Sequence, residues 1–340
     1  MENEIKSMGR LSVEDFKNEM RHSLTASNSL FSTPGIEQAI TTTTAVMGKV
    51  LNTQYYELNG QKLSDFTPIE VGFGAFQSKL LQMATTAQGT DFNSCLINPT
   101  TGAIKLDGQT DIEVGSLEYV NHFFRDTYTI SKEGSEMASR ARIPFNLLEE
   151  KERARKKKFD LGLQYAWFFG SDSPSGKSYG LLNQPNAVVN TSYLPAKIKD
   201  MTDAQFATFV ANLRGLYNDQ TNGTANFDRI CLAQDDYFAL DAVYGSFGMT
   251  RRQILEDVVR ANNGKIVYTL YNETAGSTGG ARYALYKYDA DYIQGFLPLE
   301  YTPSPLYPQG AFDLISNAMA QFVTPQLKRT NTLVYLDVVS

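Results

Sequence analysis

The residues with the clearest chemical potential lie in one short loop, Gly176-Lys177-Ser178. A Gly-Lys-Ser sequence ends the phosphate-binding loop of many nucleotide-binding enzymes, in which backbone amides and the lysine hold the phosphates. That motif needs a glycine at position 171, which is Ser171 here, and a helix that begins directly after it. The following residues, YGLLNQPN, contain a proline and predict no helix, so an ordinary surface loop is favoured. A soluble nucleotide-binding enzyme that uses Lys177 is the weakest alternative we retain.

The same loop reads Gly-x-Ser-x-Gly around Ser178, which is the pattern of a serine-hydrolase nucleophile. That nucleophile needs a strand before the serine and a histidine later in the chain. Here a long helix is expected before the loop, and the two histidines, His22 and His122, both precede Ser178. Neither histidine has a second histidine or a cysteine at the spacing of a metal site. Structural roles are therefore favoured for both histidines.

The cysteines and carboxylates offer no stronger candidate. Cys231 lies in the apolar stretch RICLA, where a buried, inert thiol is expected, and no basic residue adjoins Cys95 to lower its pKa. Two cysteines provide neither a disulfide framework nor a thiolate metal site. The acidic pair Asp235-Asp236 is more typical of a helix start than of a catalytic dyad. The sequence therefore predicts a protein that is not an enzyme, with no cofactor and no metal site.

The composition is that of a globular protein with a sizeable core. Of the 340 residues, 42% are hydrophobic and 20% are charged. The net charge of −6 argues against a general polyanion-binding protein, although a local basic patch is compatible with it. The chain contains no run of about 18 apolar residues, and its N-terminus lacks the apolar segment of a secretory signal. We therefore expect a cytoplasmic product that makes no membrane contact.

The element that must position the Gly-Lys-Ser loop is a long helix predicted over Pro144–Phe169. Pro144 suits a first helical turn, and Gly170 suits the residue that ends a helix. The first half is charged, with Glu149–Arg153 and Glu152–Lys156 at the favourable i,i+4 spacing, and the second half is apolar almost all round. Such a helix is expected to run from a surface into a core.

The basic residues of this helix, among them Arg153, Lys156 and Lys157, suggest a contact with nucleic acid. They spread around the whole circumference of the helix, however, and do not form one groove-facing stripe. A solvated half-helix stabilised by salt bridges is therefore the favoured interpretation of the charge pattern.

The N-terminal third predicts an arm and two β features. Residues 1–35 are expected to form an arm with a short amphipathic helix, whose apolar side includes Leu11, Phe16 and Met20 and needs another surface to lie on. Asn59-Gly60 between TQYYEL and QKLSDF predicts a tight β-hairpin. Residues 84–116 are rich in turn formers and poor in large apolar side chains. They form either a mobile loop, which is slightly favoured, or a long hairpin that lies on a neighbouring molecule.

A compact α/β block is predicted over residues 194–301. Thr202 with Gln205 and Thr250 with Gln253 have the spacing of helix capping boxes. The strand candidates are residues 229–233, 265–270 and 283–288. Two further strand-like runs, residues 312–323 and 332–339, close the chain. Both are expected to return to the sheet begun before the block, which would make the block an insertion.

This order of features resembles the major capsid protein of tailed bacteriophages of the Hong Kong 97 type. The segment Gly180-Leu181-Leu182-Asn183-Gln184-Pro185-Asn186, directly after the long helix, is similar to the family's G-[LI]-[LI]-N-x-P turn. The resemblance implies an α+β fold with an N-terminal arm over residues 1–35 and an extended loop over residues 84–116. It also implies a peripheral domain with a long spine helix, over residues 36–83, 117–193 and 302–340, and an axial domain over residues 194–301.

The resemblance further implies self-assembly into hexamers and pentamers that close an icosahedral shell around phage double-stranded DNA. The protein would be part of the virion capsid, assembled in the cytoplasm of a bacterial host. Scaffolding, portal and decoration proteins are the other implied partners, and the DNA would be bound without sequence specificity. An encapsulin-like nanocompartment shell, which encloses a cargo enzyme, is the alternative with the same fold. The residues expected at assembly contacts are Leu11, Phe16, Met20, Phe92, Leu96, Ile104, Leu106, Arg153, Lys156, Lys157, Gly180, Leu181, Asn183 and Pro185.

Overall fold

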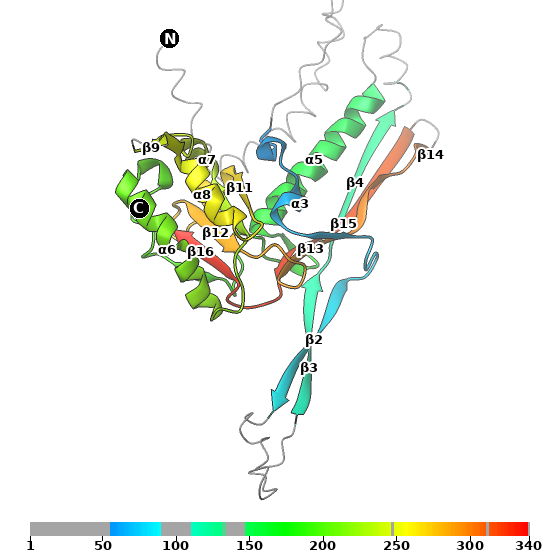
Figure 1. Ribbon diagram of the computed structural model, residues 1–340. Helices are drawn as coiled ribbons and strands as arrows, with labels where there is room; N and C mark the ends of the chain where they lie inside the picture. The colour runs from blue at the N-terminus through cyan, green and yellow to red at the C-terminus, as the bar shows by residue number, and fades with distance from the viewer. Residues whose placement is uncertain are drawn as a thin grey trace, which may run out of the picture.

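The computed structural model describes residues 55–89, 110–131, 133, 147–245, 248–310 and 313–338. These residues form two sheets, each with its own helices, and a long hairpin that projects from the body (Figure 1). The predicted arm of residues 1–35 and the tip of the 84–116 excursion lie outside the described residues. So does Pro144, at the start of the predicted long helix.

The first sheet carries the long helix on one face. Its strand order is β1 (Ile69–Val71), β13 (Ile293–Pro303), β15 (Asp313–Leu327) and β14 (Tyr307–Gln309), and β4 (His122–Ser131) pairs with β15. The helix α5 (Leu147–Phe169) lies beside β4 and β15 (Figure 1). It confirms the predicted helix, and Gly170, with φ of +81°, ends it.

The apolar half of α5 is anchored in a core beneath this sheet. Trp167 and Phe168 are fully buried, and the Phe168 ring meets Phe66 edge-on at 5.0 Å between centroids. The indole nitrogen of Trp167 donates to Thr67 Oγ1 at 2.9 Å. A Cβ at Gly295 would lie 2.3 Å from Trp167 Cη2, so β13 can pass this close to the helix only with a glycine there.

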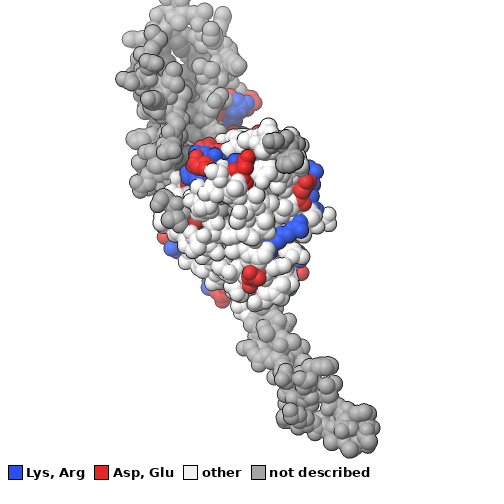
Figure 2. Space-filling view, turned by 60° about the vertical axis from the view of Figure 1, so that its left-hand side comes forward, with Lys and Arg blue, Asp and Glu red and all other residues white. Residues whose placement is uncertain are grey.

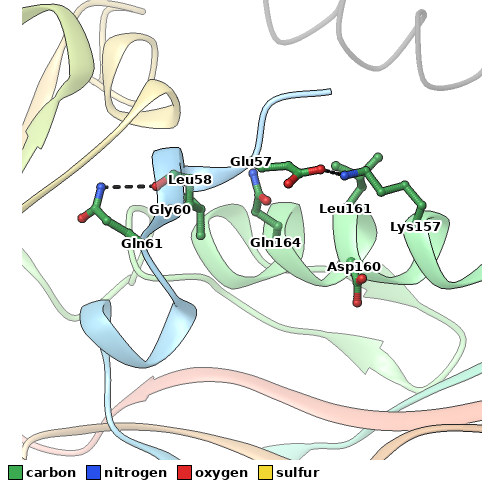
Figure 3. Close-up of a pocket in the computed structure, with 8 residues that line it drawn as sticks. All are labelled: Glu57, Leu58, Gly60, Gln61, Lys157, Asp160, Leu161 and Gln164. Atoms are coloured by element: carbon green, nitrogen blue, oxygen red, sulfur yellow. Dashed lines mark hydrogen bonds and ion pairs between the residues drawn. The ribbon is translucent and has the colours of Figure 1, made fainter. Parts of the chain in front are cut away.

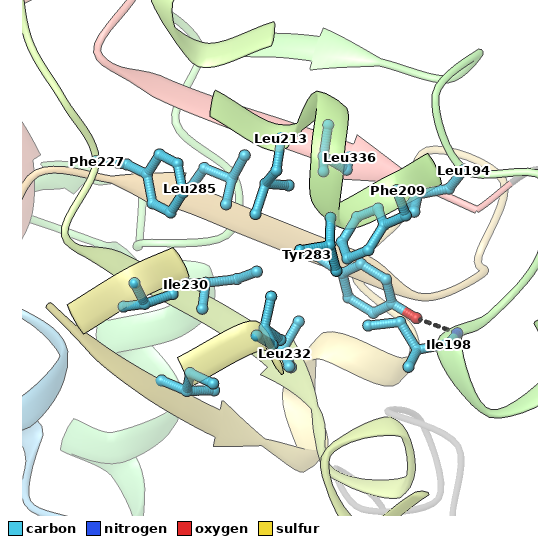
Figure 4. Packing of buried hydrophobic residues seen from close by; sticks show 14 of the residues in the cluster. Leu194, Ile198, Phe209, Leu213, Phe227, Ile230, Leu232, Tyr283, Leu285 and Leu336 are labelled. Carbon is cyan, nitrogen blue, oxygen red and sulfur yellow. Dashed lines mark hydrogen bonds between the residues drawn. The ribbon is translucent and has the colours of Figure 1, made fainter. Parts of the chain in front are cut away.

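The second sheet forms the compact α/β block. Its order is β11 (Lys265–Thr269), β8 (Arg229–Ala233), β12 (Arg282–Tyr286), β16 (Leu333–Asp337) and β7 (Val188–Asn190). The helices α6 (Asp203–Thr221), α7 (Gln234–Ala239) and α8 (Arg251–Arg260) pack around it, and Figure 4 shows the apolar core that they share with the sheet. Both predicted capping boxes are present, with Thr202 at the start of α6 and Thr250 at the start of α8.

The predicted hairpin at Asn59-Gly60 is wrong. Both residues have positive φ, as a tight turn requires, but they end a short 3-10 helix, η2 (Leu58–Gly60), which the helix α3 (Leu63–Phe66) follows. The flanking residues form no cross-strand ladder, because the bond from Gln61 N to Leu58 O at 2.9 Å only closes the 3-10 turn. Leu58 is buried with α5, and the Gln61 side chain donates to Tyr268 O of β11 at 2.9 Å. Contacts with α5 and β11 thus take the place of the cross-strand hydrogen bonds that the Asn59-Gly60 sequence predicted.

The expectation for the two closing strands is half correct. β15 returns to the first sheet, where it pairs with β4. β16 pairs with β12 and β7 instead, at the interior of the second sheet. All five residues of β16 are buried, and a strand that is apolar on both faces needs a sheet that is covered on both sides. β13, which begins inside the predicted block, pairs in the first sheet.

The long excursion is a hairpin over its described residues. β2 (Lys79–Gly89) and β3 (Thr110–Val120) form a continuous antiparallel ladder, so the slightly favoured mobile-loop prediction is wrong for these residues. Figure 1 shows the hairpin extending away from both sheets. At its root, Leu80 and Tyr119 are buried against Phe296 and Val323 of the first sheet. Burial raises the pKa of Tyr119 to about 12, so its hydroxyl stays protonated and donates to Gln82 Oε1 at 3.0 Å.

The remaining short elements connect these parts. They are β5 (Asp172–Ser173), β6 (Gly176–Lys177), η4 (Ile198–Asp200), β9 (Val243–Tyr244), β10 (Met249–Thr250) and η5 (Leu270–Glu273). No helix in the described part of the chain is both long and apolar enough to cross a membrane.

Candidate functional site: the hairpin root and the exit of α5

The Gly-Lys-Ser loop does not have the geometry of a phosphate-binding loop. β5 and β6 pair with each other as a small antiparallel hairpin directly after α5, and residues 178–187 after them are non-helical. Lys177 is exposed, with its ammonium group 5.4 Å from the centroid of the Tyr179 ring. A phosphate-binding loop joins a strand to a helix N-terminus, and this loop does the reverse.

The structure brings together a histidine and a serine that the sequence had left apart. The ring nitrogens of His122 lie 2.7 Å from Ser178 Oγ and 2.8 Å from Ser173 Oγ. A histidine beside a serine is part of a hydrolase site, but here both side chains are buried and the third group is another serine in place of an acid. The cluster therefore serves as a link between β4 and the loop after α5. Burial lowers the pKa of His122, which favours the neutral ring.

A small pocket of about 260 Å³ lies between η2 and α5 (Figure 3). An ion pair joins Glu57, next to η2, to Lys157 of α5, and Asp160 and Gln164 also line the helix side. These groups do not combine a nucleophile with a base. Within the described residues, no group of three or more His, Cys, Asp and Glu side chains could hold a metal ion.

The segment from Gly180 to Asn186 closes the C-terminal end of α5. The backbone N–H groups of Leu181 and Leu182 donate to Trp167 O and Phe168 O, both at 2.9 Å. These bonds satisfy carbonyls that the end of a helix otherwise leaves unpaired.

Asn183 and Gly180 complete this closure. The Asn183 amide donates to Phe169 O at 2.6 Å and accepts from Gly180 N at 2.6 Å. A Cβ at Gly180 would lie 2.3 Å from the Phe168 carbonyl carbon, so only glycine allows this approach. Gly180, Leu181 and Asn183 thus make contacts within the chain, whereas Pro185 is exposed. A role for the four residues in assembly stays a prediction.

The charged half of α5 is less exposed than predicted, because Arg155 is buried. Its guanidinium donates to Ser316 O at 2.9 Å and to the Tyr301 hydroxyl at 2.9 Å, and it pairs with Glu152. It also lies 4.5 Å from the centroid of the Tyr128 ring. Sequence reasoning missed this residue, although Arg155, Phe159 and Leu163 follow the i,i+4,i+8 spacing of one helix face.

The predicted contact residues on α5 lie on its outer side. Arg153 is exposed and pairs with Glu149 at 3.8 Å and with Glu150 at 3.0 Å, which confirms the predicted Glu149–Arg153 pair. Lys156 is exposed, and Lys157 pairs with Glu57. The other predicted contact residues lie outside the described residues: Leu11, Phe16, Met20, Phe92, Leu96, Ile104 and Leu106.

Four apolar side chains that the sequence did not single out form a patch where the hairpin meets the first sheet. Phe73, Phe76, Phe123 and Met319 are 53%, 65%, 50% and 42% exposed, and we call them the root patch. Phe76 has φ of +64°, which is rare for a bulky residue, and Gln321 holds its backbone by accepting from Phe76 N at 2.8 Å.

Strand register places these side chains next to one another. Gln321 is paired with Phe123, and Met319 lies two residues before Gln321 on the same face. Phe73 contacts Phe296, which is paired with Val323, two residues beyond Gln321. The neighbouring residue Phe124 points the other way, to Phe159 of α5, so the root patch lies on the sheet face opposite the helix.

In the view of Figure 2, the described surface shows no large patch of a single charge sign. Basic and acidic groups are interspersed over the α6–α8 side of the body, with uncharged surface between them.

Comparison with solved structures identifies the architecture. The chain matches the capsid of Myoviridae phage XM1 with a TM-score of 0.70 over 87% of this chain and 97% of that chain, at 13% identity. The capsid of a native GTA particle matches with a TM-score of 0.56 over 92% of this chain and 100% of that chain, at 9% identity. The chain has the Hong Kong 97-type capsid fold.

A chain from mycobacterium phage Che8 matches in the same way, with a TM-score of 0.51 at 11% identity over 87% of this chain and 97% of that chain. No protein-family model matches the sequence, and no curated protein is detectably similar to it. The likeness is therefore one of fold, and it confirms the fold class that the order of sequence features implied.

Proposed function

We propose that this protein is the major capsid protein of a tailed bacteriophage and that it assembles into hexamers and pentamers of an icosahedral shell. The observation that carries the proposal is the match to the XM1 capsid, which covers 97% of that chain and therefore a whole capsid subunit. The proposed location is the virion capsid, assembled in the cytoplasm of a bacterial host, and the proposed content is double-stranded DNA.

The architecture supports self-association. Among the described residues β2 and β3 pair only with each other, and a two-stranded hairpin of this kind is marginally stable alone and exposes unpaired backbone groups. The root patch adds two exposed phenylalanines on a loop and two exposed apolar side chains on a sheet face. We infer that copies of this chain cover the hairpin and the root patch of their neighbours. Many such contacts, each weak, would add up to a stable shell.

We infer that the first sheet with α5 is the peripheral domain and that the second sheet with α6–α8 is the axial domain. The exposed outer side of α5, with Arg153 and Lys156, would then face a neighbour or the packaged DNA. Contacts to the DNA backbone by such residues would be independent of base sequence. Portal, scaffolding and decoration proteins are further proposed partners.

Negative-stain microscopy of the purified protein tests the proposal, since it requires large closed particles. The variants Phe73→Ser and Phe123→Thr should reduce the yield of closed shells. Val189→Thr is the matched control, because Val189 is 45% exposed on the edge strand β7, in the other sheet. Small monodisperse protein from the wild type would refute the proposal. Closed particles that contain a protein cargo and no nuclease-protected DNA would instead favour the encapsulin-like alternative.

A further inference from the structure

The chain passes from the hairpin into the first sheet at a buried polar junction. β3 ends at Val120 and β4 begins at His122, so only Asn121 separates the two sheets. Asn121 is fully buried, and its amide donates to Gln77 O at 2.8 Å and to Gln321 Oε1 at 3.4 Å. The direction in which the hairpin leaves the body therefore depends on what holds these two junction residues.

His122 ties this junction to the exit of α5. Its side chain is 2% exposed, and its two ring nitrogens contact Ser173 and Ser178, which lie in the loop directly after α5. The ring also lies against Phe322 of β15, at 5.2 Å between centroids. One side chain thus joins the hairpin root, the first sheet and the end of the long helix.

The two serines can adapt to the charge of the ring. A neutral imidazole donates from one nitrogen and accepts at the other, whereas an imidazolium must donate from both. The hydroxyls have other acceptors, because Ser178 Oγ lies 3.4 Å from Ser171 O and Ser173 Oγ lies 3.4 Å from Gly176 O. Each serine can therefore accept from the ring, so protonation does not abolish the hydrogen bonds.

Protonation would instead place a charge on a ring that is 2% exposed and whose two hydrogen-bond partners are neutral serines. On β15, the residues on the same face as Phe322 are Ala320 and Thr324, which carry no charge. On β4, the same face presents Asp126, which is held by Lys158 at 3.0 Å. In the loop after α5, the charged groups are Asp172 and Lys177, and both side chains are exposed to solvent.

We propose that His122 is a proton-sensitive positioning residue, whose neutral ring locks the hairpin root to the exit of α5 and whose protonation in mild acid loosens that lock. The contacts that form this lock all lie within one chain. Its consequence, a pH-dependent orientation of the hairpin toward neighbouring subunits, rests on the proposed function.

The sign of the effect follows from burial. Burial lowers the pKa of His122 in the locked state, so the locked state binds fewer protons than an opened state with an ordinary histidine. The lock is complete above about pH 6.5, the ordinary pKa of histidine, and weakens as the pH falls below it. The opening equilibrium changes by up to about tenfold per pH unit until the locked state also binds the proton.

Hydrogen exchange measured by mass spectrometry between pH 7.5 and pH 5 tests the lock. In the wild type, the protection factors of residues 120–124 and 171–180 should fall by up to about tenfold per pH unit below pH 6.5, while those of α6 stay constant. His122→Gln, which can donate and accept but cannot be protonated, should abolish this pH dependence. His22→Gln, at the only other histidine, is the matched control and should preserve it. The same pH dependence in His122→Gln would overturn the proposal.

A second measurement keeps the test decisive if His122→Gln does not fold. The slow exchange of the imidazole C2 hydrogen, followed by mass spectrometry against pH, reports the pKa of a single histidine. In the His22→Gln protein, His122 should titrate below pH 6.5, and a midpoint at or above that value would overturn the proposal. Both readouts use the full chain in the oligomeric form in which it purifies. Loss of shells in micrographs, by contrast, bears on the proposed function alone.

Discussion

Replacing Arg155 with methionine removes the buried cation of α5 while keeping an apolar stem of similar length. The substitution abolishes donation to Ser316 O and to Tyr301, and it leaves the Glu152 carboxylate without its guanidinium partner. Removing one partner of a buried ion pair costs about 3–5 kcal/mol. The Glu152 side chain is 32% exposed, so water partly replaces the lost partner, and we expect the low end, about 3 kcal/mol.

Arg153→Met is the matched control on the same helix. Arg153 pairs with Glu149 and Glu150, but its side chain is 56% exposed, and exposed ion pairs contribute about 0–1 kcal/mol. The two variants therefore remove the same charge two residues apart, and only one removes buried hydrogen bonds.

Urea unfolding followed by tryptophan fluorescence measures the difference. The chain has one tryptophan, Trp167, and it lies fully buried in α5, so the signal reports the half of the molecule that carries the substitution. With an m-value of about 3 kcal/mol per molar urea, Arg155→Met should lower the midpoint by about 1 M. Arg153→Met should move it by about 0.3 M or less. Equal shifts for the two variants would refute the assignment of Arg155 as a buried anchor.

Two further predictions concern close packing and thiol reactivity. Gly180→Ala should cost about 3 kcal/mol in the same urea assay, because the new methyl group meets the Phe168 backbone. In the control Gly215→Ala, in α6, a Cβ meets nothing within 4 Å, so this variant should be stabilised by about 0.5–1 kcal/mol. Equal effects of the two variants would contradict the packing at Gly180. Cys231 is fully buried, and burial raises the pKa of its thiol. In a Cys95→Ser background, Cys231 should therefore react with a disulfide reagent only after the protein unfolds. Stoichiometric labelling of the native protein within minutes would contradict that burial.

The elements that the sequence predicted correctly are those encoded by neighbouring residues. The helix over Leu147–Phe169 follows from its own periodicity and from Gly170, and the starts of α6 and α8 follow from capping boxes that span four residues. The strand β8 is present at the predicted residues, 229–233. Together, the order of such elements along the chain was sufficient to indicate the capsid fold that the solved structures confirm.

Only the tertiary structure decided the contacts between residues far apart in the chain. Asn59-Gly60 has the backbone of a tight turn, yet Leu58 packs in the core with α5 and the Gln61 side chain bonds β11, so no strand ladder follows the turn. β16 joins the second sheet, and not the first as expected, because both of its faces are buried and need cover. The link from His122 to Ser178 spans 56 residues, and no local pattern encodes a contact of that separation.

Chemical function depends on the same long-range contacts. In the sequence, Lys177 and Ser178 belong to motifs typical of enzymes, and the basic residues of α5 form a single charged run. The fold places Lys177 on the surface, buries Ser178 against His122 and divides the basic run between an inner anchor and an outer face. A local sequence determines which secondary structure a segment prefers. Burial is a property of the whole chain, because it is set by which distant surfaces meet, and here burial decided which charged and polar groups are structural and which are available for binding.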